Sequence, residues 1–192
     1  PQPFSMLYTG RLNRRYGLEL LLQAMKELHD PDIELWLCGS GEMEEEIRAY
    51  AAQDSRIRFF GFLPHEEAVQ LQKKATVLVN PRTNQGEYTK YSFPSKTIEY
   101  LASGTPMVGY RLPGIPDEYF EYIYEVSPDE HGLEDCLKKV MLLSERERNE
   151  FGLSAKHFIQ NEKNAAKQCA NIMVLIEGIM TRCTNPKNRG SK

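Results

Sequence analysis

Residues 75–110 have the sequence ATVLVNPRTNQGEYTKYSFPSKTIEYLASGTPMVGY. The apolar run at 75–79 predicts a buried strand, and a polar loop follows it. FPSK at 93–96 predicts the start of a helix that ends at Gly104, before a further apolar strand at 105–109. A helix N-terminus offers unpaired backbone N–H groups and the positive end of its dipole. The hydroxyls and lysine at this helix start therefore predict a site for a phosphate-bearing ligand.

The same alternation of strand and helix continues on both sides of this stretch. Apolar runs predict strands at 5–9, 33–38, 57–60, 75–79, 105–109 and 122–126. Helical spacing of apolar residues predicts helices at about 17–29, 42–53, 64–75, 93–103, 129–143, from 144, and 161–182. Short, continuously apolar strands alternating with helices are typical of a parallel sheet covered on both faces. The sequence therefore predicts an α/β fold, a Rossmann-like doubly wound parallel sheet of about six strands.

The composition is that of an ordinary globular protein, with 41% hydrophobic and 27% charged residues among 192. A net charge of −3 gives no overall basic field, which argues against binding to nucleic acid. The four cysteines form no CxxC pair and no metal-ligand spacing with the four histidines, so no metal site is expected. Cys38 lies in an apolar strand and is expected in the core. We therefore expect a reduced, cytoplasmic protein.

The chain begins with Pro1-Gln2-Pro3 and has no initiator methionine, which indicates a piece of a longer protein. We expect one domain over residues 1–183 and a disordered tail over 184–192. No apolar run is long enough for a transmembrane segment, and no signal peptide is present.

A basic turn between Gly10 and Gly17 supplies the first candidate ligands. In parallel sheets, ligands bind outside the carboxyl ends of the strands, and this turn lies there. Arginine suits phosphate because its planar fork donates two parallel hydrogen bonds. Arg11, directly after the first strand, is the strongest candidate. Arg14 and Arg15 are equally well explained as part of a solvated turn.

Two further strand ends carry candidate binding residues. Gly39 and Gly41 could let the backbone approach a ligand, although a tight strand-to-helix turn explains them equally well. This segment matches neither the dinucleotide fingerprint nor a P-loop. Phe62 and Leu63 lie just past the strand at 57–60 and are expected to flank a planar base.

The helix at 93–103 carries Glu99, which accepts hydrogen bonds only and could hold a pair of ribose hydroxyls. An exposed surface glutamate is the alternative. Lys96 could pair with phosphate, and Ser92 and Ser95 could cap the helix or donate hydrogen bonds. Glu87 is an isolated acid in the preceding loop. Because no Ser/His/Asp set, Cys/His pair or closely spaced acid pair is present, covalent hydrolase chemistry has little support.

Four segments together resemble a known family: YTGRL at 8–12, LCGSGE at 37–42, FFGFLP at 59–64 and FPSKTIEYLASGTPMV at 93–108. They are similar to the C-terminal domain of the group 1 family of retaining glycosyltransferases, in particular a branch associated with capsular and other surface polysaccharides. The resemblance implies a two-domain GT-B enzyme that transfers a sugar, of hexosyl type, from a nucleotide-sugar without an essential metal. This chain would be the donor-binding half and inactive alone, because the acceptor-binding domain is missing.

The resemblance also implies roles for individual residues. Arg11 would meet the diphosphate, Phe62 and Leu63 would flank the base, and Glu99 would hold the ribose. Catalysis would consist of stabilising the departing diphosphate, with Arg11 and Lys96 as the cations. The acceptor would be a glycan or a lipid-linked sugar, met at the inner face of the membrane.

The chain departs from the family pattern at two positions. The second glutamate usual eight residues before Glu99 is replaced by Tyr91, and Glu87 could take over part of its role. The lysine usual before the helix-start glycine is replaced by Tyr16, so that Arg14 or Arg15 would have to substitute for it. A non-catalytic Rossmann-like nucleotide-binding or protein-interaction module is therefore the alternative function. The sequence names neither the sugar, the base nor the acceptor.

Overall fold

The computed structural model describes residues 3–84 and 93–184, with side chains as far as Met180. The chain falls into two compact units, one ending at Lys156 and the other beginning at His157. The sequence-based expectation of a single domain over residues 1–183 stays a prediction.

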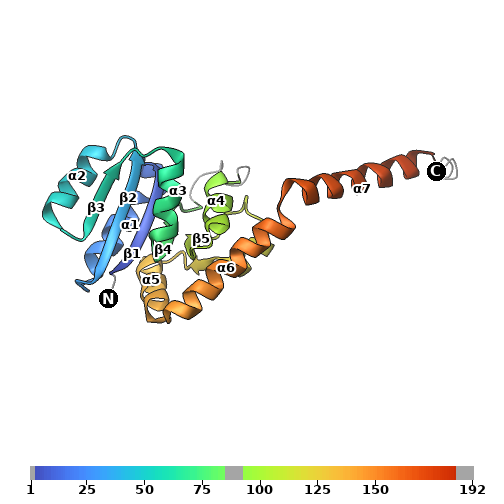
Figure 1. The fold of residues 1–192 in the computed structure, drawn as a ribbon. Coiled ribbons are helices and arrows are strands. Elements are labelled where there is room, and N and C mark those ends of the chain that lie inside the picture. Colours follow the sequence, from blue (N-terminus) through green and yellow to red (C-terminus); the bar gives the residue numbers. More distant parts are fainter. Residues whose placement is uncertain (1–2, 85–92, 185–192) are drawn as a thin grey trace. The chain divides into compact units, whose positions relative to one another are not determined.

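A six-stranded parallel sheet forms the centre of the first unit (Figure 1). Its strands run in the order β3-β2-β1-β4-β5-β6. They are Phe4–Arg11 (β1), Ile33–Ser40 (β2), Ile57–Gly61 (β3), Val77–Asn80 (β4), Met107–Tyr110 (β5) and Tyr124–Val126 (β6). This is the order of the doubly wound nucleotide-binding fold, with its reversal between β1 and β4. The predicted fold class is therefore confirmed.

Helices alternate with these strands and cover the sheet. They are Leu18–Glu27 (α1), Glu44–Gln53 (α2), His65–Lys74 (α3), Ser95–Ser103 (α4), Gly132–Leu142 (α5) and Glu145–Glu162 (α6), which runs across the unit boundary. Helix α1 packs against α5, and α3 packs against α4. Figure 1 shows α3 in front of the sheet and α1 behind it. The predicted helix boundaries agree to within about three residues.

The sequence explains these elements locally. Met6, Leu7 and Tyr8 of β1 are all fully buried, as expected for a strand covered on both faces. The predicted capping box at the start of α6 is formed: the Ser144 amide donates to Glu147 at 2.8 Å, and the Glu147 amide donates to Ser144 Oγ at 3.2 Å. One prediction differs, because the segment leading to β6 is a 3₁₀ helix over Asp117–Tyr122 before the strand begins.

The second unit contains helix α7, Ala165–Thr184. Its apolar side chains from Ile172 to Ile176, and Ile179 and Met180, are all exposed. None of the described helices combines the length and apolar character needed to cross a bilayer.

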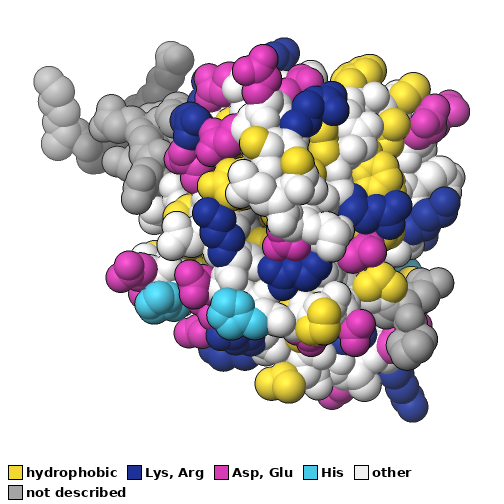
Figure 2. Space-filling view, turned by 90° about the vertical axis from the view of Figure 1, so that its left-hand side faces the viewer, with side chains coloured by type: hydrophobic (Ala, Val, Ile, Leu, Met, Phe, Trp, Pro, Cys, Tyr) yellow, Lys and Arg dark blue, Asp and Glu magenta, His cyan; other side chains and the backbone are white. Residues whose placement is uncertain are grey.

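On the face shown in Figure 2, Lys and Arg side chains are interspersed with Asp and Glu, in keeping with the small net charge.

Strands β1 and β4 are paired only over their first halves. The register joins Met6 to Val77 and Leu7 to Leu78 and then stops, whereas β1 stays paired with β2 as far as Arg11. The carboxyl ends of β1 and β4 therefore separate and leave a crevice at the topological switch point, where ligands bind in this fold.

Gly17, at the start of α1, fixes one side of this crevice. Its φ is 80°, and a Cβ placed on it would lie 2.0 Å from the carbonyl oxygen of Pro81, just after β4. Only glycine fits here, because both the backbone angle and the close approach exclude a side chain. Gly17 thereby allows the loop after β4 to pass against the start of α1.

We predict that Gly17→Ala destabilises the chain more than Gly61→Ala. Both residues have positive φ, which costs alanine about 1–2 kcal/mol, but among the described residues nothing lies within 4 Å of a Cβ at Gly61. The clash with Pro81 should add about 1–3 kcal/mol for Gly17→Ala. Urea unfolding of the two variants measures the difference, and equal free energies of unfolding would contradict the close approach.

Candidate functional site

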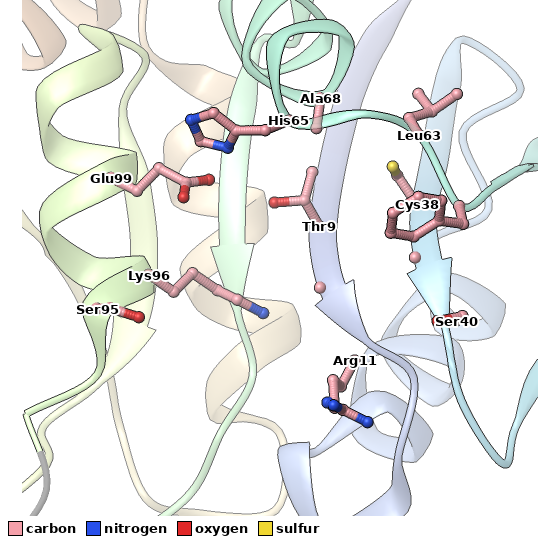
Figure 3. A pocket seen from close by; sticks show the side chains of 13 residues that line it. Thr9, Arg11, Cys38, Ser40, Leu63, His65, Ala68, Ser95, Lys96 and Glu99 are labelled. Atoms are coloured by element: carbon pink, nitrogen blue, oxygen red, sulfur yellow. The ribbon is translucent and has the colours of Figure 1, made fainter.

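A cavity of about 470 Å³ lies at the carboxyl ends of the strands (Figure 3). Its walls come from the ends of β1 and β2, the start of α3 and the first turns of α4. The lining residues are Thr9, Gly10, Arg11, Cys38, Gly39, Ser40, Phe62, Leu63, His65, Ala68, Ser95, Lys96 and Glu99.

Glu99 is positioned by a buried hydrogen-bond network. The side-chain amide of Gln72, which is fully buried, donates to Glu99 Oε1 and to Thr9 Oγ1, the latter at 3.2 Å. The Tyr100 phenol oxygen accepts from the backbone N–H of Thr9 at 2.8 Å. One carboxylate oxygen of Glu99 is thus engaged by the protein, and the side chain extends into the cavity (Figure 3).

The ammonium group of Lys96 lies at the end of β1. Its Nζ is 3.7 Å from the ring centroid of Tyr8 and 6.0 Å from that of Tyr100. A Cβ on Gly10 would come within 2.6 Å of this nitrogen, so glycine is needed for the lysine to reach its place.

Burial is the main cause that lowers the pKa of Lys96 to about 7, although the side chain as a whole is only partly buried. Glu99 acts in the opposite direction, and the nearby Arg82 lowers the pKa further. At neutral pH the amine is therefore close to losing its proton, and an anion bound beside it would restore the charge.

Eight of the predicted binding residues line this cavity together: Gly10, Arg11, Gly39, Phe62, Leu63, Ser95, Lys96 and Glu99. Gly39 is also needed by the protein itself, because a Cβ there would lie 1.7 Å from the carbonyl oxygen of Gly10. Gly41 does not line the cavity. A Cβ at that position would lie 2.6 Å from the backbone of Leu12, which fits the alternative of a tight turn.

Of the three arginines in the basic turn, Arg11 lines the cavity, whereas Arg14 and Arg15 lie outside it. Arg14 bonds Glu46 at 2.6 Å and also Glu19, and Arg15 donates to Tyr16 Oη at 2.9 Å. Neither arginine lines the cavities described here. Arg15 nevertheless contacts Tyr16, which stands at the position of the missing lysine, so substitution for that lysine by Arg14 or Arg15 stays a prediction.

Three further predicted positions cannot be compared with the structure. Glu87, Tyr91 and Ser92 lie outside the described residues.

His65 and Arg82 are two of the residues at the site that the sequence did not single out. His65 begins α3, lines the cavity and lies beside Glu99 in Figure 3. Arg82 stands two residues after Asn80, the last residue of β4, and is only 9% exposed, in a smaller adjoining cavity of about 260 Å³. The signal for Arg82 was its position just past a buried strand, the same position that marked Arg11.

The parallel sheet and its flanking helices define a Rossmann-like domain of the GT-B glycosyltransferase type. The chain belongs to the family described as "Glycosyl transferases group 1", whose model matches residues 3–142. The predicted group 1 glycosyltransferase family is thereby confirmed, while retention and the surface-polysaccharide branch stay predictions.

Curated relatives and solved structures agree with this assignment. D-inositol 3-phosphate glycosyltransferase of Corynebacterium diphtheriae is 34% identical over 122 residues, covering 58% of this chain and 27% of that protein. The amylovoran biosynthesis glycosyltransferase AmsK of Erwinia amylovora is 25% identical, covering 60% and 30%. The structure of HepE from Anabaena, solved with UDP, shares the fold, with a TM-score of 0.73 and 14% identity over 92% of this chain and 49% of that one. This chain thus spans under a third of the length of these curated relatives.

We predict that Lys96→Met stabilises the ligand-free chain, and does so more at pH 6 than at pH 9. Below pH 7 the folded chain carries the full cost of burying the Lys96 charge. Between the folded pKa of about 7 and the ordinary 10.5, the unfolded chain binds more protons, so this cost declines as the pH rises. Urea unfolding at the two pH values measures the change.

Lys73→Met is the matched control, because it removes the same side chain from the exposed end of α3. The buried charge would be contradicted if Lys96→Met raised the free energy of unfolding equally at pH 6 and pH 9. It would also be contradicted if Lys73→Met gave the same change.

Proposed function

We propose that this chain is the donor-binding part of a glycosyltransferase that transfers a hexosyl-type sugar from a nucleotide-sugar to an acceptor, with retention of anomeric configuration. The single observation that carries the proposal is the cavity at the β1/β4 switch point, where Arg11, Lys96 and Glu99 converge from two elements. It offers an acid for hydroxyls and two cations for phosphates within one space.

The nucleoside would occupy the part of the cavity near Phe62 and Leu63. Phe62 is 75% exposed and lines the cavity, so its ring offers a surface that a planar base would cover. Glu99 is held by Gln72 through one oxygen, so its other oxygen is the acceptor available for a ribose hydroxyl.

The diphosphate would meet Arg11, Lys96 and the start of α4. Ser95, the first residue of α4, lines the cavity beside Lys96, and the free N–H groups of this helix N-terminus favour an anion. During transfer, these cations and N–H groups would stabilise the charge that develops on the departing diphosphate. Glu87 and Ser92 remain predicted contributors from the loop before the helix.

A role in glycan or polysaccharide synthesis is supported by the relative AmsK, an amylovoran biosynthesis glycosyltransferase. The acceptor, glycan or lipid-linked, would be bound by an N-terminal domain outside this chain. A cytoplasmic location at the inner face of the membrane also stays a prediction.

The alternative is a non-catalytic nucleotide-binding or interaction module. Tyr16, in place of the lysine usual in the family, is the described residue that favours it. Binding of a nucleotide without turnover of any nucleotide-sugar by the full-length protein would decide for this alternative.

We predict that the 192-residue chain binds a nucleoside diphosphate, and that Arg11→Gln and Glu99→Gln each weaken binding about 10- to 100-fold. Each variant removes a charged hydrogen-bond partner worth about 1.5–3 kcal/mol. Calorimetry with UDP, GDP and ADP measures the affinity, and UDP is the first probe because the Anabaena neighbour was solved with it.

Arg14→Gln and Glu67→Gln are the matched controls, since both change the same charge outside the cavity. If none of the three diphosphates binds the unchanged chain at millimolar concentration, the proposed function is wrong. If the controls weaken binding as much as the cavity variants, the assigned positions are wrong.

We predict retention for the full-length protein. Proton NMR of the first product formed from a nucleotide-sugar with an α-linked sugar should show an α-linkage. A β-linked first product would show inversion and contradict this part of the proposal.

A further inference from the structure

We propose that Arg82 is a third cationic ligand of the diphosphate, and that the smaller cavity it lines holds the phosphate farther from the nucleoside. This inference rests on the proposed function, because it divides the same site into two parts.

The two cavities are joined through shared residues. The larger cavity contains Phe62, Leu63 and Glu99, the residues suited to a base and a ribose. The smaller one is lined by Tyr8, Arg11, Tyr16, Asn80, Arg82, Pro94, Ser95 and Lys96. Arg11, Ser95 and Lys96 line both. With the nucleoside bound in the larger cavity, the diphosphate attached to it would pass this junction and extend into the smaller cavity.

Arg82 reaches the smaller cavity from the loop after β4, the strand that lies next to β1 at the switch point. Arg11 ends β1, and Arg82 stands two residues after Asn80, the last residue of β4. The tight contact of Gly17 with Pro81 holds this segment against the start of α1. The guanidinium lies over the ring of Tyr16, 6.0 Å from its centroid. Tyr16 is thus a surface for the arginine at the position where the family has a lysine.

The charges in the smaller cavity favour an anion. Its described lining contains three basic side chains, Arg11, Arg82 and Lys96, and no carboxylate. Like charges that face one small space repel each other, and Arg82 adds to the lowering of the Lys96 pKa that burial mainly causes. A bound phosphate would relieve the repulsion and satisfy several donors at once.

The number of cations matches the leaving group better than the donor. A nucleotide-sugar carries about two negative charges on its diphosphate. The released nucleoside diphosphate carries about three at neutral pH, because its terminal phosphate has a second pKa near 6. A third cation therefore stabilises the departing group more than the bound donor, which is the condition for a faster reaction.

The test compares a nucleoside diphosphate with its monophosphate on the 192-residue chain by calorimetry. With UDP and UMP as probes, Arg82→Gln should weaken UDP binding about 10- to 100-fold and leave UMP binding nearly unchanged. If GDP or ADP is the diphosphate that binds, GMP or AMP replaces UMP. Arg82→Lys should fall between wild type and Arg82→Gln, since it keeps the charge and loses the fork.

Arg146→Gln is the matched control, because it removes one arginine charge from an exposed position of α6 that lines neither cavity. If the unchanged chain prefers UDP to UMP and Arg82→Gln behaves like Arg146→Gln, the inference is overturned while the proposed function stands. An equal loss of UMP and UDP binding in both Arg82 variants also overturns it, because the arginine then only supports the fold. If no nucleotide binds the unchanged chain, both fail together.

Discussion

The separation of β1 from β4 after Leu7 and Leu78 is the constraint on which the rest of this structure depends. A strand that loses its neighbour leaves backbone groups without ladder partners, and a buried N–H without a partner costs about 1–3 kcal/mol. The phenol of Tyr100, from α4, accepts the N–H of Thr9 at the point where β4 no longer runs alongside. The crevice can therefore stay open because a side chain replaces the missing strand contact.

The hydrogen bond between Thr9 and Tyr100 also belongs to a network that connects the core to the site. Thr9 also binds Gln72 of α3, and Gln72 binds Glu99 of α4, one residue before Tyr100. Three elements are thus tied together by one buried polar network, which restricts the position of the Glu99 carboxylate. Burial does not favour the charged form of Lys96 in the same way, because it lowers the pKa of the ammonium group. In the free site, the Glu99 carboxylate is therefore held in position to bind hydroxyls. The positive charge on Lys96, in contrast, is unfavourable until an anion binds.

The sequence predicted the fold because strand ends and helix starts are local features, visible within short windows such as the run from Phe93 to Val108. The same local features singled out Arg11, Lys96 and Glu99, which line one cavity in the structure, while their roles stay predictions. Gln72 could not be found in this way, because its bond to Thr9 spans 63 residues. Arg82 follows a strand, as Arg11 does, but its contact with Tyr16 depends on the reversed strand order. Such contacts arise from tertiary structure alone.

The cations of the smaller cavity come from three different elements: the end of β1, the loop after β4 and the first turn of α4. No one of these elements concentrates the charge, so an ensemble with native helices but without the β1/β4 register would lack the site. Assembling the site brings like charges together, which the hydrophobic contacts of the sheet must offset. An anion bound there would remove that opposition, so ligand binding and the pairing of β1 with β4 should stabilise each other. The β1/β4 junction, where only two residue pairs are in register, is therefore the part of the sheet that a bound diphosphate would strengthen.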